Sequence, residues 1–180
     1  MSEIYSPKED SFLLSKTLES ELPKFLKQNP DLKFIEIGAG SGINLETAKN
    51  LGVKTENLFS SDINQKAVNH CKKLGFNCVK SDLFQNIKGK FDIVIFNPPY
   101  LPEDKREPKD SRIATTGGKK GSEIINKFLK QAKEHLNNKG KIFLLTSSLT
   151  KEIKWQNWKK KIIGREKLFF ERLCIWEINS

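Results

Sequence analysis

Short apolar runs alternate with amphipathic segments from about residue 31 onward. Apolar runs of about four to eight residues bounded by polar residues are typical of buried strands, whereas apolar residues at every third or fourth position are typical of a helix. Their alternation predicts an α/β fold with a mostly parallel sheet covered on both faces. We predict strands at 32–37, 57–60, 77–80, 91–96 and 141–146, and helices at 44–50, 65–74 and 122–136.

A further amphipathic helix is predicted before the first strand, with an apolar face formed by Phe12, Leu14, Leu18 and Leu22. The tetrapeptide at 6–9 has the form of a capping box, with Pro7 at the first helical position. Near the other end of the chain, segments 162–167 and 168–178 predict an antiparallel hairpin that closes the sheet. We expect one domain over 1–180, in which residues 1–30 form a covering helix and residues 31–180 form the core.

In the predicted helix 122–136, Ser122 stands at the N-cap position, and the run 137–140 is typical of a left-handed helix stop.

Two segments in the second half of the chain lack a regular pattern. The loop 101–120 is long for a compact domain, and such loops are often functional. The segment 151–161 after the fifth strand is basic and contains Trp155 and Trp158.

The composition is that of a globular protein. At 180 residues and 20.6 kDa, with 37% apolar residues, the chain is long enough for one packed core. No apolar run reaches the roughly 20 residues that span a bilayer, and the acidic first ten residues do not resemble a secretory signal. Cys71, Cys78 and Cys174 lack the spacing of a zinc site or a disulfide framework. We therefore expect no membrane contact, no metal and a cytoplasmic location.

The formal net charge of +10 leaves two interpretations open. Clustered Lys and Arg attract polyanions such as RNA. Only four of the 32 basic residues are Arg, however, and a lysine-rich surface can simply be solvated. Charge alone does not choose between an RNA contact and a solvated surface.

Glycines follow the first predicted strand, at Gly38, Gly40 and Gly42. Glycines at a strand-to-helix junction let the backbone approach a ligand closely, and the amides there favour an anionic group. The dinucleotide fingerprint would need its third glycine at Ile43. The spacing therefore disfavours NAD.

Acidic residues follow the next two strands. Asp62 stands where a carboxylate accepts hydrogen bonds from the hydroxyls of a ribose. Asp82 and Leu83 offer a carboxylate for an amino group and an apolar side chain for a flat ring. Taken alone, each aspartate is also typical of an ordinary helix N-cap. Since the carboxyl ends of parallel strands line one crevice, together they predict a site for an adenosine that carries an amino-acid group.

The sequence Asn97-Pro98-Pro99-Tyr100 ends the fourth predicted strand, beside the same crevice. The prolines stiffen the turn and hold Asn97 out of the helical region. The side-chain oxygen of Asn97 and the carbonyl of Pro98 can then both accept from one incoming NH2 group, while Tyr100 offers a face to a planar group. The run also suits a plain strand-terminating turn.

These motifs resemble those of the S-adenosylmethionine-dependent amino methyltransferases of Rossmann-like fold. The run 5–14 and the run 117–121 are similar, more closely, to the HemK family of release-factor glutamine methyltransferases, in its short archaeal and eukaryal branch. The resemblance implies a protein-(glutamine-N5) methyltransferase that acts on the Gly-Gly-Gln motif of a class 1 release factor. It implies S-adenosylmethionine as the cofactor, residues 1–30 as an active-site cover and residues 31–180 as the catalytic core.

The resemblance also implies roles for individual residues. Asn97, Pro98 and Tyr100 are the expected catalytic residues, and with Pro99 they form the expected substrate pocket. Pro7, Glu9 and Asp10 help to close the site, although Glu9 suits a capping box equally well. The cofactor contacts that the family pattern implies are Ser11, Glu36, Gly38, Gly40, Asp62, Asp82, Leu83 and Asn97.

Two alternative functions remain open, and the resemblance also implies one partner protein. The same pocket suits the exocyclic amine of adenine or guanine in RNA or DNA, although no residues remain for a separate base-recognition domain. A non-catalytic cofactor-binding protein is the other alternative. The resemblance implies a small zinc-binding activator subunit in a heterodimer. The predicted third strand suits such a partner, as an edge strand with Phe76 and Val79 exposed.

Overall fold

The computed structural model describes residues 4–104 and 114–179. Its helices are α1 (Glu9–Gln28), α2 (Ile43–Asn50), α3 (Gln65–Lys73) and α5 (Glu123–Ala132), with 3-10 turns at Thr55–Asn57 and Lys133–His135. Its strands are β1 (Phe34–Ile37), β2 (Leu58–Asp62), β3 (Asn77–Lys80), β4 (Phe91–Phe96), β5 (Leu136–Ser147), β6 (Lys159–Lys167) and β7 (Arg172–Asn179).

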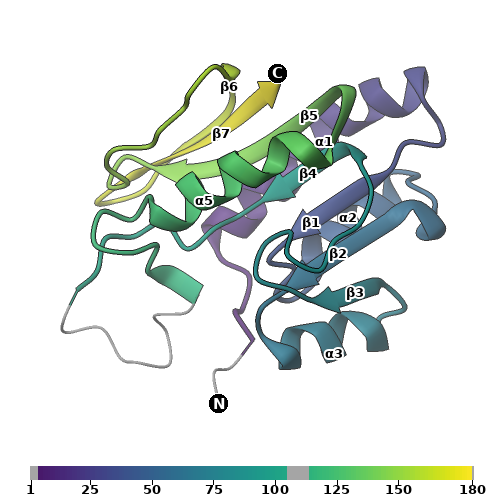
Figure 1. The fold of residues 1–180 in the computed structure, drawn as a ribbon, viewed down its shortest axis with the longest axis horizontal. Helices are drawn as coiled ribbons and strands as arrows, with labels where there is room; N and C mark the ends of the chain where they lie inside the picture. The colour runs from purple at the N-terminus through teal and green to yellow at the C-terminus, as the bar shows by residue number, and fades with distance from the viewer. Residues whose placement is uncertain (1–3, 105–113, 180) are drawn as a thin grey trace.

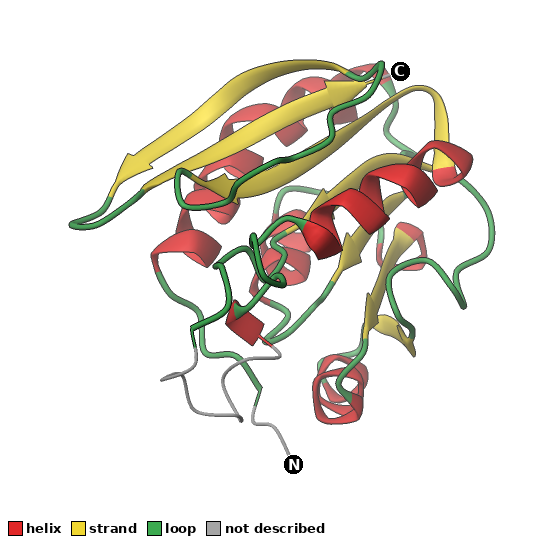
Figure 2. Cartoon of the chain, turned by 60° about the vertical axis from the view of Figure 1, so that its left-hand side comes forward, coloured by secondary structure: helices red, strands yellow, loops and turns green. Residues whose placement is uncertain are grey.

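The strands form one seven-stranded sheet in the order β3-β2-β1-β4-β5-β7-β6 (Figure 1). The first five strands of the chain are parallel, and β7 pairs antiparallel with both β5 and β6. Figure 2 shows helices on both faces of the sheet. The predicted α/β fold and the antiparallel hairpin at the end of the chain are confirmed.

Successive side chains of the central strands contribute alternately to two apolar layers, one on each face of the sheet. In β4, Ile93 and Ile95 point into the layer that includes α1, α2 and α3, whereas Val94 and Phe96 point into the layer under α5. Successive strand residues face opposite sides of a sheet, so a strand that is covered twice is apolar throughout. Each fully buried side chain of this size contributes about 1.5–3 kcal/mol.

Helix α1 begins later than the capping-box pattern predicted. Its N-cap is Lys8, which makes no side-chain cap hydrogen bond, and its first residue is Glu9. Leu14, Leu18 and Leu22 are fully buried as expected. Phe12 is 55% exposed, so its assignment to the apolar face was wrong. It lies two positions from Leu14, which places it on the opposite side of a 3.6-residue turn.

The helix predicted at 122–136 stops at Ala132, and β5 already begins at Leu136. The predicted helix stop at 137–140 is therefore wrong, because these residues lie inside β5, with Lys139 in a left-handed conformation (φ 68°). Tertiary contacts end the helix early. The ring of His135 stacks on Phe84, and Leu136 pairs with Phe91 of β4.

Strand β3 is an edge strand, as expected, but Phe76 is only 5% exposed. The prediction that Phe76 is exposed was wrong, because its ring packs into the α1, α2 and α3 layer and lies under the ammonium of Lys49. Smaller shifts occur at β1, which starts at Phe34, and at β2, which extends to Asp62. Part of the predicted loop 101–120, residues 105–113, lies outside the described residues.

None of the helices in the described ranges is long and apolar enough to cross a membrane.

Candidate active site

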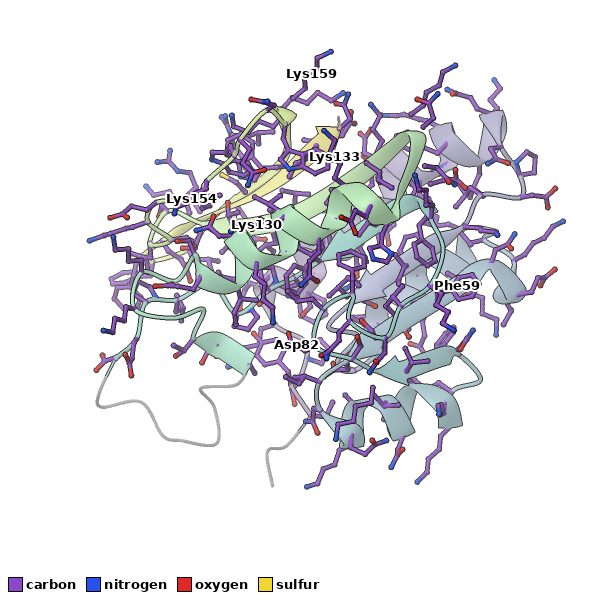
Figure 3. The ribbon with its side chains drawn as sticks, viewed as in Figure 1. Phe59, Asp82, Lys130, Lys133, Lys154 and Lys159 are labelled. Carbon is purple, nitrogen blue, oxygen red and sulfur yellow. The ribbon has the colours of Figure 1, made fainter. Side chains whose placement is uncertain are left out.

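A cavity of about 480 Å³ opens at the carboxyl ends of the parallel strands. This volume is typical of small-molecule sites, and the edge is the one where α/β sheets bind ligands. The structure brings ten of the predicted site residues together here, and Figure 3 labels one of them, Asp82. They are Ser11, Glu36, Gly38, Gly40, Asp62, Asp82, Leu83, Asn97, Pro98 and Pro99. Tyr100 and the predicted closing residues Pro7 and Glu9 are not among the described residues that line the cavity, whereas Asp10 is.

Asp62 holds the glycine-rich loop as well as facing the cavity. Its Oδ2 accepts from Gly40 N at 2.9 Å, and its Oδ1 accepts from Asn64 N at 2.7 Å. Burial raises the pKa of Asp62, and these backbone amides act in the opposite direction. The Ile63 amide also bonds this carboxylate, so three of its roughly four acceptor sites are used and one remains for a ligand hydroxyl.

Glu36 is 1% exposed, and its oxygens differ. Oε1 accepts from Asn44 Nδ2 at 2.7 Å, whereas Oε2 has no hydrogen-bond partner among the described residues. Burial raises the pKa of Glu36 to about 8, and the nearby charge of Asp62 adds to the rise. The Asn44 amide is fixed in turn by Ser15 of α1, whose hydroxyl donates to Asn44 Oδ1 at 2.9 Å. The sequence reasoning missed Asn44, and no local pattern distinguishes this asparagine from a surface one.

Asp82 and Leu83 lie at the far end of the cavity. The Asp82 carboxylate pairs with Lys127 of α5, with 2.5 Å between Nζ and Oδ2. Leu83 is buried in a left-handed conformation (φ 52°), and its carbonyl accepts from the Ser61 hydroxyl at 3.3 Å. A bulky residue at positive φ is uncommon, and such strain often occurs at binding sites. The sequence reasoning did not identify Lys127 either, because it lies 45 residues from Asp82 along the chain.

Asn97 follows β4 at the centre of the site. Its Oδ1 is buried and has no hydrogen-bond partner among the described residues. Buried acceptors are almost always paired, and an unpaired one costs about 1–3 kcal/mol. Because Asn97 lines the cavity, this oxygen can accept a hydrogen bond from a donor group of a bound ligand.

Tyr100 points to the Asp10 carboxylate instead of lining the cavity. Burial raises the pKa of Tyr100, the charges of Asp10 and Glu171 raise it further, and a hydrogen bond to Asp10 adds to the rise. Tyr5, which the sequence reasoning passed over, donates to Asp10 Oδ2 at 3.1 Å and lines the cavity. Asp10 at the start of α1 thus interacts with both phenols, and Tyr100 connects it to the turn after β4.

The glycines at 117–121 support this turn from behind. A Cβ on Gly117 would lie 2.5 Å from Pro99 O, and one on Gly121 would meet Tyr100 O well inside contact distance. Gly117 N also donates to Leu101 O at 2.9 Å. Only glycine lets these two backbone segments approach so closely.

A family model described as "Eco57I restriction-modification methylase" matches residues 11–169. The chain is 36% identical over 187 residues to a Methanocaldococcus jannaschii protein named as a protein N5-glutamine methyltransferase, with 96% of this chain and 90% of that protein covered. It is 31% identical to the eRF1 methyltransferase catalytic subunit mtq2 of Schizosaccharomyces pombe, covering 83% of this chain and 74% of that one. It is 37% identical to the release factor glutamine methyltransferase of Borreliella burgdorferi, covering 86% and 56%.

Solved structures agree in fold. The ribosomal protein L11 methylase of Lactobacillus delbrueckii superposes with a TM-score of 0.67 at 17% identity, covering 97% of this chain and 80% of that one. The 16S rRNA N2 G1207 methyltransferase of T. thermophilus gives 0.62 at 14% identity, covering 96% and 43%. By its matches to the family model and to these named relatives, the chain belongs to the HemK-like family of N5-glutamine methyltransferases.

Proposed function

We propose that this protein transfers the methyl group of S-adenosylmethionine to the side-chain nitrogen of the glutamine in the Gly-Gly-Gln motif of a class 1 release factor. The relatives named as release factor or eRF1 methyltransferases support this substrate. The observation that carries the proposal is the buried, unpaired Oδ1 of Asn97 on the cavity wall. A primary amide presents two N–H donors, and this acceptor suits one of them.

The residues of the cavity fit the cofactor. Asp62 keeps an acceptor site for a ribose hydroxyl, and the unpaired Glu36 Oε2 suits an ammonium group. Leu83 and the 57% exposed Ile63 provide apolar surface for a planar ring. When bound, the cofactor supplies an electrophilic methyl group on a sulfonium. The adenine amine would share Asp82 with Lys127.

The chain's own contribution to the reaction is orientation. The nitrogen of an amide is a poor nucleophile because its lone pair is delocalised into the carbonyl. Asn97 Oδ1 and the Pro98 carbonyl hold the two N–H groups and direct the nitrogen toward the cofactor region. Both dipoles also stabilise the positive charge that develops on nitrogen during transfer. The proton leaves after the transfer, so no general base is required.

One transfer assay tests the substrate. Purified release factor, its Gly-Gly-Gln variant with glutamine replaced by alanine, and total RNA are offered side by side with methyl-labelled cofactor. We expect label in the intact release factor alone. Label in the alanine variant, or in RNA and not in the release factor, would contradict the proposal.

N-methylation of an exocyclic base amine in RNA or DNA is the second candidate. The match to a family model named for a restriction-modification methylase and the net charge of +10 favour it. The RNA arm of the assay separates it from the first candidate.

We further propose a small zinc-binding activator subunit that forms a heterodimer with this chain. The fission yeast relative is named as a catalytic subunit, which supports a second subunit. Zinc would belong to that subunit, because no group of three or more His, Cys, Asp or Glu within 4–104 and 114–179 is arranged to hold a metal. The edge strand β3 offers unpaired backbone groups, although the burial of Phe76 leaves only the half-buried Val79 as an apolar contact.

The division into a cover over residues 1–30 and a catalytic core over 31–180 remains part of the proposal. The cavity contacts of Tyr5, Asp10 and Ser11 support it. A cytoplasmic location is also proposed, and the three free thiols support a reducing compartment.

A further inference from the structure

The α5 side of the sheet is covered unevenly. Helix α5 packs over β4 and β5, but no helix among the described residues lies over β7 and β6 on that side (Figure 1). The irregular segment 148–158 crosses this area instead. A groove of about 550 Å³ remains between that segment and the strands. Its walls include Trp155, Trp176, Arg165 and Arg172.

The strands bring three cations together at one end of the sheet: Arg165 and Arg172 line this groove, and Lys167 lies beside it. Lys167 of β6 lies directly opposite Arg172 of β7, and Arg165 lies two positions from Lys167 on the same face of β6. All three side chains are exposed. None of them forms an ion pair with a carboxylate in the described part of the chain. Like charges directly opposite one another destabilise a sheet, so this arrangement favours a bound anion.

Nearby carboxylates are already engaged. Glu152, which lines the groove, pairs with Lys120, and Glu171 accepts from the Ser147 hydroxyl. The hydrogen bond leaves the charge of Glu171 in place, but the charged residues that line the groove are two cations, Arg165 and Arg172, and one carboxylate, so the described lining carries a net positive charge. Figure 3 labels Lys130 of α5, Lys133 of the 3-10 turn after it, Lys154 of the segment before β6 and Lys159 at the start of β6, all on the same side of the molecule.

Aromatic rings lie among these cations. Trp155 and Trp176 pack with ring centroids 4.9 Å apart, and both are half-buried. Lys160 lies over the Trp155 ring at 5.1 Å, and the Trp176 indole N–H donates to Thr146 Oγ1 at 2.9 Å. Basic side chains interleaved with partly exposed aromatic rings are typical of surfaces that bind single-stranded nucleic acid, where each stacked base contributes about 1–3 kcal/mol.

We propose that this groove binds a single strand of RNA. Arg165, Lys167 and Arg172 would contact phosphates, and the indoles would stack with bases. RNA is favoured over DNA because the Ser148 hydroxyl also lines the groove: it accepts from Arg172 N at 3.0 Å and keeps its own hydrogen to donate to a ribose 2′-hydroxyl. This inference does not depend on which amine the enzyme methylates.

The groove is connected to the catalytic turn. The Thr150 hydroxyl donates to Tyr100 O at 2.9 Å, and Ser147 binds the Glu171 carboxylate. Burial and the charge of Asp10 are the main causes of the raised pKa of Tyr100, and the negative charge of Glu171 adds to them, so Glu171 lies close enough to act on Tyr100. RNA in the groove would thus lie behind the Asn97-Pro98-Pro99-Tyr100 turn, while the cofactor cavity stays open in front of it.

Fluorescence anisotropy with a labelled single-stranded RNA tests the proposal, with DNA of the same sequence and an acidic peptide as competing ligands. The double variant Arg165→Gln/Arg172→Gln removes two exposed charges, and Lys66→Gln/Lys73→Gln on α3 removes two as a matched control. We expect the first double variant to bind about tenfold more weakly. Its slope of log affinity against log salt should fall by about 1.4, that is about 0.7 for each of two phosphate contacts. The control should retain the slope.

Quenching of tryptophan fluorescence by RNA gives a second measurement, because it reports stacking and not charge. We expect quenching in the wild type and its loss in Trp176→Phe/Trp155→Phe, with circular dichroism confirming that the variant is folded. Equal loss of affinity in both charge variants, equal binding of DNA, or displacement by the acidic peptide alone would overturn the proposal. Methyl transfer to the release factor is measured in parallel, so a failure of RNA binding remains separate from a failure of the proposed function.

Discussion

At the scale of single residues, two buried oxygen atoms without a described partner lie on the walls of the same cavity. Glu36 Oε2 stands beside the glycine-rich loop, and Asn97 Oδ1 stands at the end of β4. Asn44 holds the Glu36 carboxylate through its other oxygen, and Pro98 restricts the backbone of Asn97. Fixed acceptors of this kind need no reorganisation when a donor arrives, which is the property that a transfer site requires.

Asn97→Ala tests the role of the acceptor at the end of β4. If Asn97 mainly orients the target amide, turnover should fall on the order of 10² to 10³, as for the loss of one preorganised polar group, while cofactor affinity changes far less. Steady-state kinetics and calorimetric titration of the cofactor measure the two effects. Asn69→Ala on the exposed face of α3 is the control, and it should alter neither. Equal losses of turnover and cofactor affinity would show that Asn97 is chiefly a cofactor ligand.

Glu36 makes the stability of the ligand-free protein depend on pH. Burial raises its pKa from 4.5 to about 8, so between these values the folded protein holds a proton that the unfolded chain releases. The free energy of unfolding therefore falls as pH rises from 4.5 to 8, by on the order of 1 kcal/mol per pH unit, and is unaffected by this group above that range.

Glu36→Gln should remove this contribution. Urea unfolding at several pH values measures it, with the wild type as the reference for all other titrating groups. We expect the difference in unfolding free energy between variant and wild type to change steadily between pH 4.5 and 8. A difference that stays constant over that interval would mean that Glu36 is ionised in the folded protein.

At the scale of elements, the turn after β4 depends on a distant segment. The glycines at 117–121 pack against the backbone of Pro99 and Tyr100, and Thr150 after β5 holds Tyr100 O from another side. Two prolines restrict the backbone dihedral angles of the turn, and the contacts with the glycines and Thr150 restrict its position. The turn is therefore rigid before any substrate binds.

Gly117→Ala should damage the turn. The added methyl group would overlap Pro99 O and Gly121 O, so we expect a loss of about 1–3 kcal/mol in unfolding free energy and a larger loss of turnover than stability alone explains. Gly75→Ala is the matched control, because it costs about 1–2 kcal/mol through its positive φ but meets no neighbouring atom within 4 Å. Chemical unfolding and methyl transfer are compared for both variants. Full turnover in Gly117→Ala would show that the turn does not need this support.

At the scale of the whole molecule, the sheet has two different edges. Strand β3 is short, with four residues, and ends in Lys80, whereas β6 has nine residues and is rich in lysine. Short strands and lysines are both features that discourage edge-to-edge association. The β3 edge carries fewer charges and is the better place for an added strand from the activator subunit.

Val79→Lys tests this edge. A second lysine beside Lys80 should weaken binding of a co-expressed zinc-binding subunit, and Glu166→Lys on β6 should not. Size-exclusion chromatography measures the complex, which we expect to bury roughly 1,200–2,000 Å² and to raise the melting temperature of the catalytic chain. A fully active wild-type monomer that shows no shift on adding the zinc protein would refute the heterodimer and leave the methyltransferase proposal intact.

The sequence alone determined the architecture. Buried strands such as β4 (Phe91–Phe96) are marked by continuous apolar runs, and β3 and β4 have the predicted bounds. The cavity could be anticipated because parallel strands place their carboxyl ends together, so motifs that follow successive strands must meet. That rule brought Gly38, Asp62, Asp82 and Asn97 to one site.

Only the tertiary structure decided which polar groups are paired. The contacts of Asn44 with Glu36, of Lys127 with Asp82 and of Tyr5 with Asp10 join residues whose positions relative to one another depend on packing. The same reason explains the wrong expectations for Phe76 and for the end of α5, where long-range contacts outweigh local pattern. Periodicity records which face of an element is buried, but the partner across that face is set by how the elements pack.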